Sequence, residues 1–203
     1  DASLWSDAVR GGLCAELAKG DALGVGEIGL DYFREHAAPE QQRVAFTAQI
    51  AIARDLDLPI VIHQRSAEQD VLDTLRRFAP VRGVMHCFSG ASAFADACLE
   101  LGLYLGVGGV ITHPKSVDIR EALRTSSLDR FVLETDAPFL APQLVRGKRN
   151  EPAHVSEIAA RLAELQGHSI VKIADITSAN AIHLFGGRLE AARIAGMKLA
   201  ACA

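Results

Sequence analysis

The sequence lacks any long hydrophobic run, although 49% of its 203 residues are hydrophobic. No apolar stretch approaches the ~18 residues that a membrane-spanning helix needs, and no secretory signal is visible. The chain begins with Asp1 rather than Met. We therefore expect no membrane partner and an ordinary globular chain that is long enough to bury a core.

Cysteine is scarce and scattered, and the 4 cysteines form no CxxC pair: Cys14, Cys87, Cys98 and Cys202. We expect free thiols in a reducing compartment, which predicts a cytoplasmic protein. The simplest role for each cysteine is that of a small buried hydrophobic residue.

An excess of basic residues is also missing, because 21 Lys and Arg stand against 25 Asp and Glu, a net charge of −4. Proteins that coat nucleic acid through their general charge are usually basic, so the composition argues against that class. It leaves room for an enzyme that holds one phosphate through a metal ion. No internal repeat or low-complexity block is present.

What the sequence does contain is an alternation of apolar strands and amphipathic helices. We expect strands at 23–30 (the strand, which ends on Glu27, and its exit), 59–63, 82–86, 103–107 and 131–134. We expect helices at 4–19 (capped by Ser3), 39–55, 66–78, 92–101, 116–124, 154–166 and 169–185. This alternation indicates a parallel sheet covered on both faces, with the spacing of TIM-type (β/α) barrel units. A complete barrel has eight strands and about 250 residues. We therefore predict a partial barrel, with five parallel strands and outer helices, over residues 1–186, followed by a helical tail over 187–203.

Four of these strands lead into a side chain that can bind a metal ion: Glu27, His63, His86 and Asp136. The carboxyl ends of parallel strands meet on one face, so two imidazoles and two carboxylates are expected to converge there. Such a set suits a divalent ion, Mg²⁺, Mn²⁺ or Zn²⁺. Taken singly, each group is explained equally well by a salt bridge or a hydrogen-bonded core histidine. The repetition at successive strand ends favours the metal.

Two acids near the fifth strand are candidates for the metal ligand there. Glu134 and Asp136 are two residues apart and share a face, and Pro138 ends the strand because it has no backbone N–H. We predict that Asp136, which lies past the strand end, is both ligand and general base, and that Glu134 supports the ligands. A metal lowers the pKa of bound water to about 7, and Asp136 would take the proton from that water.

Cationic side chains follow Asp136 in the polar loop 140–152. We predict that Arg146, Lys148 and Arg149 hold substrate phosphates, with a solvated charge run as the alternative. Arg65 and His154 are further candidates for phosphate contacts.

Five motifs occur in an order that resembles the TatD family of metal-dependent hydrolases and deoxyribonucleases: Gly26-Glu-Ile-Gly-Leu-Asp-Tyr32, Ile62-His-Gln-Arg65, His86-Cys-Phe-Ser-Gly90, Glu134-Thr-Asp-Ala-Pro138 and Arg149-Asn-Glu-Pro152. The resemblance covers about residues 4–186. It implies an amidohydrolase-like (β/α)₈ barrel that holds one or two divalent ions at its carboxyl face and hydrolyses DNA phosphodiester bonds with a metal-bound water. It also implies Glu27, His63, His86 and Asp136 as ligands, with Asp136 as the base.

The sequence departs from the family at its beginning. The family opens with a His-x-His strand, whereas no two histidines here are two residues apart. We therefore expect strands four to eight only, at most one weakly bound ion, and open sheet edges covered by the missing strands or a partner. Two alternatives remain: an amidohydrolase-type enzyme acting on an ester, lactone or amide, and an inactive partial barrel that functions by association.

Overall fold

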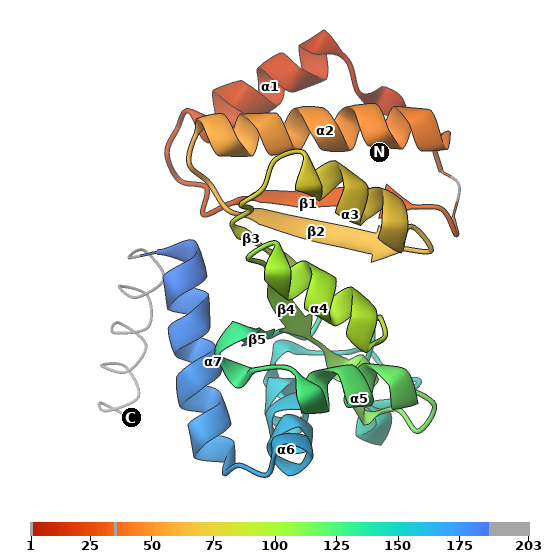
Figure 1. The fold of residues 1–203 in the computed structure, drawn as a ribbon, viewed down its shortest axis with the longest axis vertical. Helices are drawn as coiled ribbons and strands as arrows, with labels where there is room; N and C mark the ends of the chain where they lie inside the picture. Colours follow the sequence, from red (N-terminus) through yellow and green to blue (C-terminus); the bar gives the residue numbers. More distant parts are fainter. Residues whose placement is uncertain (1, 35, 187–203) are drawn as a thin grey trace. The chain divides into compact units, whose positions relative to one another are not determined.

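The structure is a computed structural model that describes residues 2–34 and 36–186 (Figure 1). It contains two compact units. The first unit runs to His86 and includes Ala97–Leu103, and the second comprises Cys87–Asp96 and the residues from Tyr104 onward. The five predicted strands are all present, and within each unit they run parallel. The predicted tail at 187–203 lies outside the described residues.

The first unit is built on three parallel strands: β1 (Val25–Asp31), β2 (Ile60–Arg65) and β3 (Gly83–Met85). Figure 1 shows the arrowheads of β1 and β2 at the same end. In the register of these two strands, Gly29 pairs with His63 and Asp31 pairs with Arg65. Parallel pairing therefore brings the carboxyl ends of β1 and β2 side by side.

Helices cover these strands because their apolar residues recur every three or four positions. The helical elements that begin in the first unit are η1 (Ala2–Leu4), α1 (Asp7–Leu17), α2 (Pro39–Asp55) and α3 (Glu68–Arg76). Helix α2 packs on β1 and buries Phe46 and Ile50. The predicted start of the first helix was wrong: Ser6, not Ser3, caps it, because the Ser6 hydroxyl accepts the amide of Val9 at 3.4 Å.

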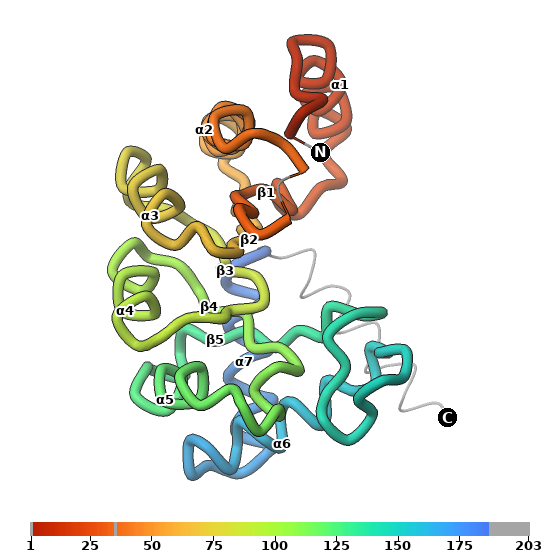
Figure 2. Tube along the Cα trace, turned by 90° about the vertical axis from the view of Figure 1, so that its right-hand side faces the viewer, coloured from red at the N-terminus to blue at the C-terminus, as the bar shows by residue number. Residues whose placement is uncertain are grey.

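The second unit holds the parallel strands β4 (Tyr104–Val107) and β5 (Phe131–Leu133). The remaining elements are α4 (Ser92–Glu100), which spans both units in sequence, η2 (Gly109–Thr112), α5 (Val117–Thr125), η3 (Leu128–Arg130), η4 (Gln143–Val145), η5 (Pro152–His154), α6 (Val155–Gln166) and α7 (Ile170–Phe185). Helix α7 packs against β5 and α6, as Figure 2 lets the reader follow. Its buried Asn180 fixes this contact by donating to the carbonyl oxygens of Leu128 at 3.0 Å and Phe131 at 2.7 Å.

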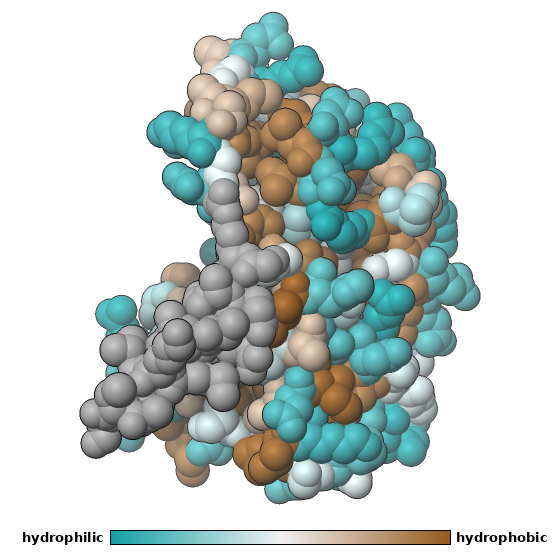
Figure 3. Space-filling model, turned by 90° about the vertical axis from the view of Figure 1, so that its left-hand side faces the viewer, coloured by the Kyte–Doolittle hydropathy of each residue, from teal (hydrophilic) through white to brown (hydrophobic). Residues whose placement is uncertain are grey.

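The surface carries scattered apolar side chains. Figure 3 shows them as brown patches interspersed with teal polar residues on one face. Such isolated exposure is ordinary for a globular protein. None of the described helices combines the length and apolar content that crossing a bilayer requires.

The three described cysteines, Cys14, Cys87 and Cys98, form no disulfide and lie in very different surroundings. Cys98 is buried as predicted, whereas Cys14 is exposed on α1, so the prediction of burial was wrong there. Burial, with a smaller contribution from the charge of Glu68, raises the pKa of Cys98 to about 12. At about pH 8, only roughly one Cys98 thiol in 10,000 is then the reactive thiolate.

We expect iodoacetamide to label Cys14 in the native protein and to label Cys98 only after unfolding. Mass spectrometry of the digested protein, with and without urea during labelling, measures both sites in one sample. Native labelling of Cys98 as fast as that of Cys14 would contradict the described packing of the first unit.

Candidate metal centre

Three of the four predicted metal ligands lie together in the first unit. The distance from Glu27 Oε1 is 2.9 Å to His63 Nδ1 and 3.8 Å to His86 Nε2. Glu27 lies on β1, His63 lies on β2, and His86 directly follows β3. The side chains of Glu27 and His63 are 45% and 37% exposed, which leaves them accessible to a ligand.

The register of the strands explains why these side chains meet. The β2–β3 pairing matches Ile62 with Met85, and the amide of His86 donates to the carbonyl of Ile62 at 2.9 Å. On the other side, Gly29 pairs with His63 and has a φ of +146°. A Cβ at Gly29 would lie 1.9 Å from the carbonyl oxygen of His63, so glycine allows β1 to approach β2 here.

A second carboxylate, Asp31, holds the other side of the His63 ring. The distance between Asp31 Oδ2 and His63 Nε2 is 3.2 Å. Asp31 Oδ1 accepts the amides of Phe33 at 3.0 Å and Arg34 at 2.9 Å, which fixes the carboxylate. The sequence analysis gave Asp31 no role. Its signal was the alternation of Glu27, Gly29 and Asp31 with the buried residues Ile28 and Leu30 along β1.

The two carboxylates make this a site of negative potential. The hydrogen bond with Glu27 is the main cause that raises the pKa of His63; burial opposes it, and Asp31 adds to it. The same bond lowers the pKa of Glu27. Burial works to raise the pKa of Asp31, but its hydrogen bonds with the two amides and His63 lower it. The two carboxylates stabilise a proton on His63 and would stabilise a divalent cation in the same way, so protonation and metal binding compete.

The donor atoms fit a divalent ion. Donors that share an ion at about 2.0–2.2 Å lie roughly 3.0–3.5 Å from one another. The separations of 2.9 and 3.8 Å around Glu27 Oε1 bracket this range. Two imidazole nitrogens and a carboxylate oxygen are also ligands that Zn²⁺ and Mn²⁺ accept. Glu27, His63 and His86 are thus the residues of the first unit that would hold the ion.

A cavity of about 580 Å³ adjoins this centre. Its lining includes Glu27, Asp31, His36 and His63, and its size lies within the ~300–1,000 Å³ of small-molecule sites. The buried amide of Gln42 on α2 accepts the amide of Asp31 at 2.7 Å and donates to its carbonyl at 3.0 Å. Helix α2 therefore fixes the wall of the cavity.

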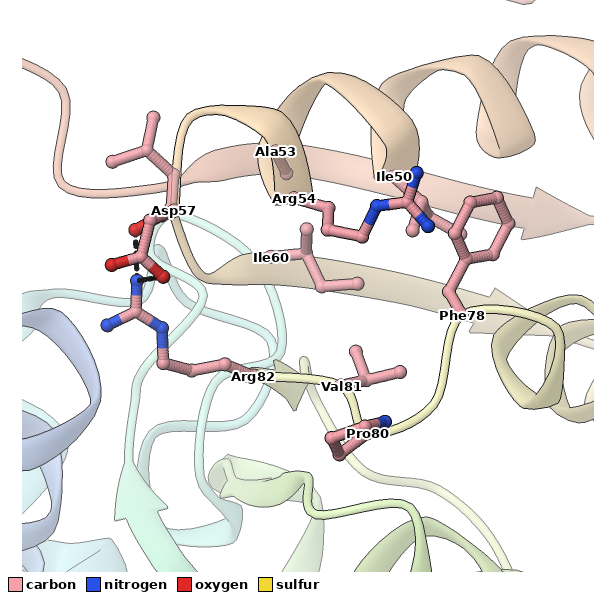
Figure 4. A pocket seen from close by; sticks show the side chains of 10 residues that line it. Ile50, Ala53, Arg54, Asp57, Ile60, Phe78, Pro80, Val81 and Arg82 are labelled. Atoms are coloured by element: carbon pink, nitrogen blue, oxygen red, sulfur yellow. Dashed lines mark hydrogen bonds and ion pairs between the residues drawn. The ribbon is translucent and has the colours of Figure 1, made fainter.

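A smaller cavity of about 130 Å³ lies near the start of β2 and beside the residues that precede β3 (Figure 4). Arg82 donates to Asp57 at its edge, and the Arg54 guanidinium lies 5.4 Å from the centre of the Phe78 ring. It contains none of the predicted ligands. The larger cavity is therefore the one associated with the candidate chemistry.

The fourth predicted ligand, Asp136, belongs to the second unit. It follows β5 in a tight turn with a φ of 56°, and its carbonyl accepts the amide of Phe139 at 2.8 Å. The side chain of Glu134 accepts the amide of Cys87. Glu134 thus holds the backbone at Cys87, and the predicted role of supporting the ligands stays a prediction.

A residue that the sequence analysis missed, Asn150, holds the Asp136 turn. Asn150 is 1% exposed, and its Nδ2 donates to the carbonyls of Thr135 and Phe139 at 2.6 Å each. Its Oδ1 lies 2.9 Å from His154 Nδ1, so His154 is part of this network, and its predicted phosphate contact stays a prediction. The motif Arg149-Asn-Glu-Pro152 was the only signal in the sequence.

The predicted phosphate-binding residues divide between the two units. Arg146, Lys148 and Arg149 are exposed in the second unit. Arg65 is in the first unit, and its guanidinium carbon lies 3.9 Å from the centre of the Phe33 ring. Phosphate binding by the basic loop therefore stays a prediction. Arg65 has a partner, Phe33, that the sequence did not reveal.

Parallel strands wrapped by helices, with Glu27 and His63 on neighbouring strands and His86 directly after a third, are typical of the α/β-barrel class of proteins that hold a metal ion. Residues 2–186 match the family model described as TatD related DNase. The chain belongs to this family, and the resemblance seen in its motifs is confirmed.

Named relatives agree. The chain is 40% identical to the uncharacterized metal-dependent hydrolase YabD of Bacillus subtilis over 80% of its length, and spans 65% of that protein. It is 35% identical to the 3'-5' ssDNA/RNA exonuclease TatD of Escherichia coli over 92% of its length, and spans 74% of that protein. The crystal structure of YJJV, a TatD homolog from Escherichia coli, superposes with a TM-score of 0.84 at 32% identity, covering 89% of this chain and 71% of the other.

Proposed function

We propose that the chain is a divalent-metal-dependent phosphodiesterase that acts on DNA. The observation that carries the proposal is the convergence of Glu27 with His63 and His86 beside a cavity of about 580 Å³. The printed names of the relatives, metal-dependent hydrolase and ssDNA/RNA exonuclease, support both the reaction class and the polymer.

In this proposal Asp136 joins Glu27, His63 and His86 as a ligand for Mg²⁺, Mn²⁺ or Zn²⁺. The ion, when bound, would lower the pKa of a water molecule and polarise a phosphoryl oxygen. The Asp136 carboxylate accepts the proton of the attacking water, and Asp31 orients the His63 ring through Nε2. The exposed basic loop contributes cations for the phosphates.

The test is hydrolysis by the 203-residue chain with Mg²⁺, Mn²⁺ or Zn²⁺. Labelled single-stranded DNA, duplex DNA, RNA and p-nitrophenyl acetate are compared, with Glu27→Gln prepared identically to exclude a contaminating nuclease. We expect metal-dependent cleavage of the nucleic acid that EDTA stops. Cleavage of the ester alone would instead support the amidohydrolase alternative, and the absence of any hydrolysis would support a partial barrel that acts by association.

The basic loop makes a separate prediction. Replacing Arg146, Lys148 and Arg149 together with alanine should raise KM for DNA and leave kcat nearly unchanged. Each lost phosphate contact on a single strand should lower the slope of log affinity against log salt by about 0.7. Steady-state kinetics at several salt concentrations measure this, with Arg161→Ala on α6 as the control, because Arg161 is paired with Glu164 at 2.7 Å. An unchanged KM and salt slope would instead support the alternative, in which the loop is a solvated run of charges.

The proposal includes a partner for β1. In the first unit, β2 pairs with one edge of β1, and no strand among that unit's described residues pairs with the other. An open strand edge is prone to pairing, so another strand is expected to cover it. Hydrogen exchange of the β1 amides measures this. The exchange should slow when a peptide that supplies the covering strand is added. A cytoplasmic setting is also proposed, in keeping with the three described cysteines that are not in disulfides.

A further inference from the structure

An exposed aromatic ring is held beside the candidate metal centre. Phe33 is 65% exposed, although it lies in the turn that directly follows β1. The Arg65 guanidinium lies over its ring, with the guanidinium carbon 3.9 Å from the ring centre. A cation that covers one face leaves the rest of an exposed ring available for a ligand.

The Phe33–Arg65 pair is anchored to the strands that carry the site. Arg65 pairs with Asp31 in the β1–β2 register, and its carbonyl accepts the amide of Tyr32 at 2.9 Å. The amide of Phe33 donates to the Asp31 carboxylate, whose other oxygen lies 3.2 Å from His63 Nε2. One carboxylate thus fixes both the His63 ring and the backbone of Phe33.

The neighbouring residue stiffens the same turn. The Tyr32 hydroxyl donates to Asp70 at 2.6 Å and accepts from Arg43 at 3.1 Å. Arg43 also donates to Asp70 at 3.1 Å, which closes a triangle between the turn, α2 and α3. The exposed Phe33 ring is therefore carried on a pre-organised backbone, which lowers the entropy cost of binding.

We propose that Phe33 and Arg65 form a base-stacking platform, on which an unpaired base of a single-stranded nucleic acid rests next to the metal centre. The inference rests on the proposed function and specifies its substrate as single-stranded. Stacking of a base on an aromatic side chain is worth about 5- to 150-fold in affinity and tolerates every base. Bases within a duplex already stack on each other, so a duplex offers no face to Phe33.

The test measures binding apart from cleavage. Fluorescence anisotropy with EDTA present gives the affinity of the 203-residue chain for labelled oligo-dT and for the same strand with abasic residues. We expect Phe33→Ala to weaken oligo-dT binding about tenfold and to leave abasic binding unchanged. Phe33→Trp should retain the affinity. The matched control is Val44→Ala, since Val44 is an apolar residue on α2 that is 52% exposed.

The salt dependence and Arg65 separate stacking from phosphate binding. Because the phenyl ring touches no phosphate, Phe33→Ala should leave the salt slope unchanged. Arg65→Gln should weaken oligo-dT binding in the native background and have no effect in the Phe33→Ala background. An Arg65 effect that persists on the abasic strand and lowers the slope by about 0.7 would make Arg65 a phosphate ligand and overturn its part in the platform.

The outcomes distinguish the platform from the proposed function. Equal affinity of the native chain and Phe33→Ala for oligo-dT, or an equal loss on the abasic strand, overturns the platform even where metal-dependent cleavage is observed. Base-dependent binding without cleavage supports the platform and overturns the proposed hydrolysis. A native chain that neither binds nor cleaves single strands overturns both.

Discussion

Replacing His63 with alanine is expected to reduce the affinity for Mn²⁺ or Zn²⁺ by at least about 100-fold and to bring metal-dependent hydrolysis to background. The physical reason is that His63 lies 2.9 Å from Glu27 Oε1 and is the ring that both carboxylates of the centre contact. Groups that merely support a ligand are already worth about 10–100-fold in affinity. Isothermal titration calorimetry of the native and variant chains measures the difference.

The control for this experiment is His168→Ala. His168 is half-buried, its ring lies 3.4 Å from Lys172 Nζ, and it belongs to a part of the second unit with no predicted ligand. Its removal should leave metal affinity unchanged. Asp31→Asn should fall between the two, with a loss of about 10–100-fold, because Asp31 only orients His63. Native metal affinity in His63→Ala would exclude His63 as a ligand.

Replacing Asn150 with alanine is expected to lower the free energy of unfolding by about 1–3 kcal/mol, since its side chain loses hydrogen bonds to two part-buried backbone carbonyls, each worth about 0.5–1.5 kcal/mol. The two carbonyls are those of Thr135 and Phe139, on either side of Asp136. Urea denaturation followed by circular dichroism measures the loss. Gln69→Ala is the control, because this exposed amide donates to the side chain of Asp73 at 2.9 Å on the surface of α3.

A second Asn150 variant tests its effect on the Asp136 turn. Asn150→Asp keeps the size and one acceptor but removes the Nδ2 donor. In the folded variant we expect kcat to fall more than KM rises, because the turn that holds the proposed base loosens while the first unit is intact. A change of less than about 0.5 kcal/mol in the free energy of unfolding of Asn150→Ala, typical of ordinary surface positions, would contradict the role of Asn150 in holding the Asp136 turn.

The five strands were predictable from the sequence because each is a short apolar run bounded by polar residues or glycine. The proximity of Glu27, His63 and His86 followed from the rule that neighbouring parallel strands run in one direction, although β1 and β2 continue past Glu27 and His63 rather than ending there as predicted. Their role as ligands stays a prediction. The start of the first helix was less determined, because Ser3 and Ser6 are both good caps. The bond between Ser6 and the amide of Val9 decides the choice.

The supporting contacts were beyond the sequence because they join distant segments. Asn150 bonds to carbonyls 15 and 11 residues earlier, and a backbone carbonyl carries no signature of its partner. From the sequence, Arg65 was predicted only as a cation for phosphate contacts. Its contact with Phe33 arises only from the β1–β2 register, which places Arg65 opposite Asp31.

Diffraction from crystals of the chain grown with Mn²⁺, recorded at the manganese absorption edge, tests the central claim most directly. We predict an anomalous peak about 2.0–2.3 Å from a carboxylate oxygen of Glu27 and from ring nitrogens of His63 and His86. The peak should be absent from crystals of His63→Ala. A saturating peak elsewhere, with these three side chains unligated, would contradict the account.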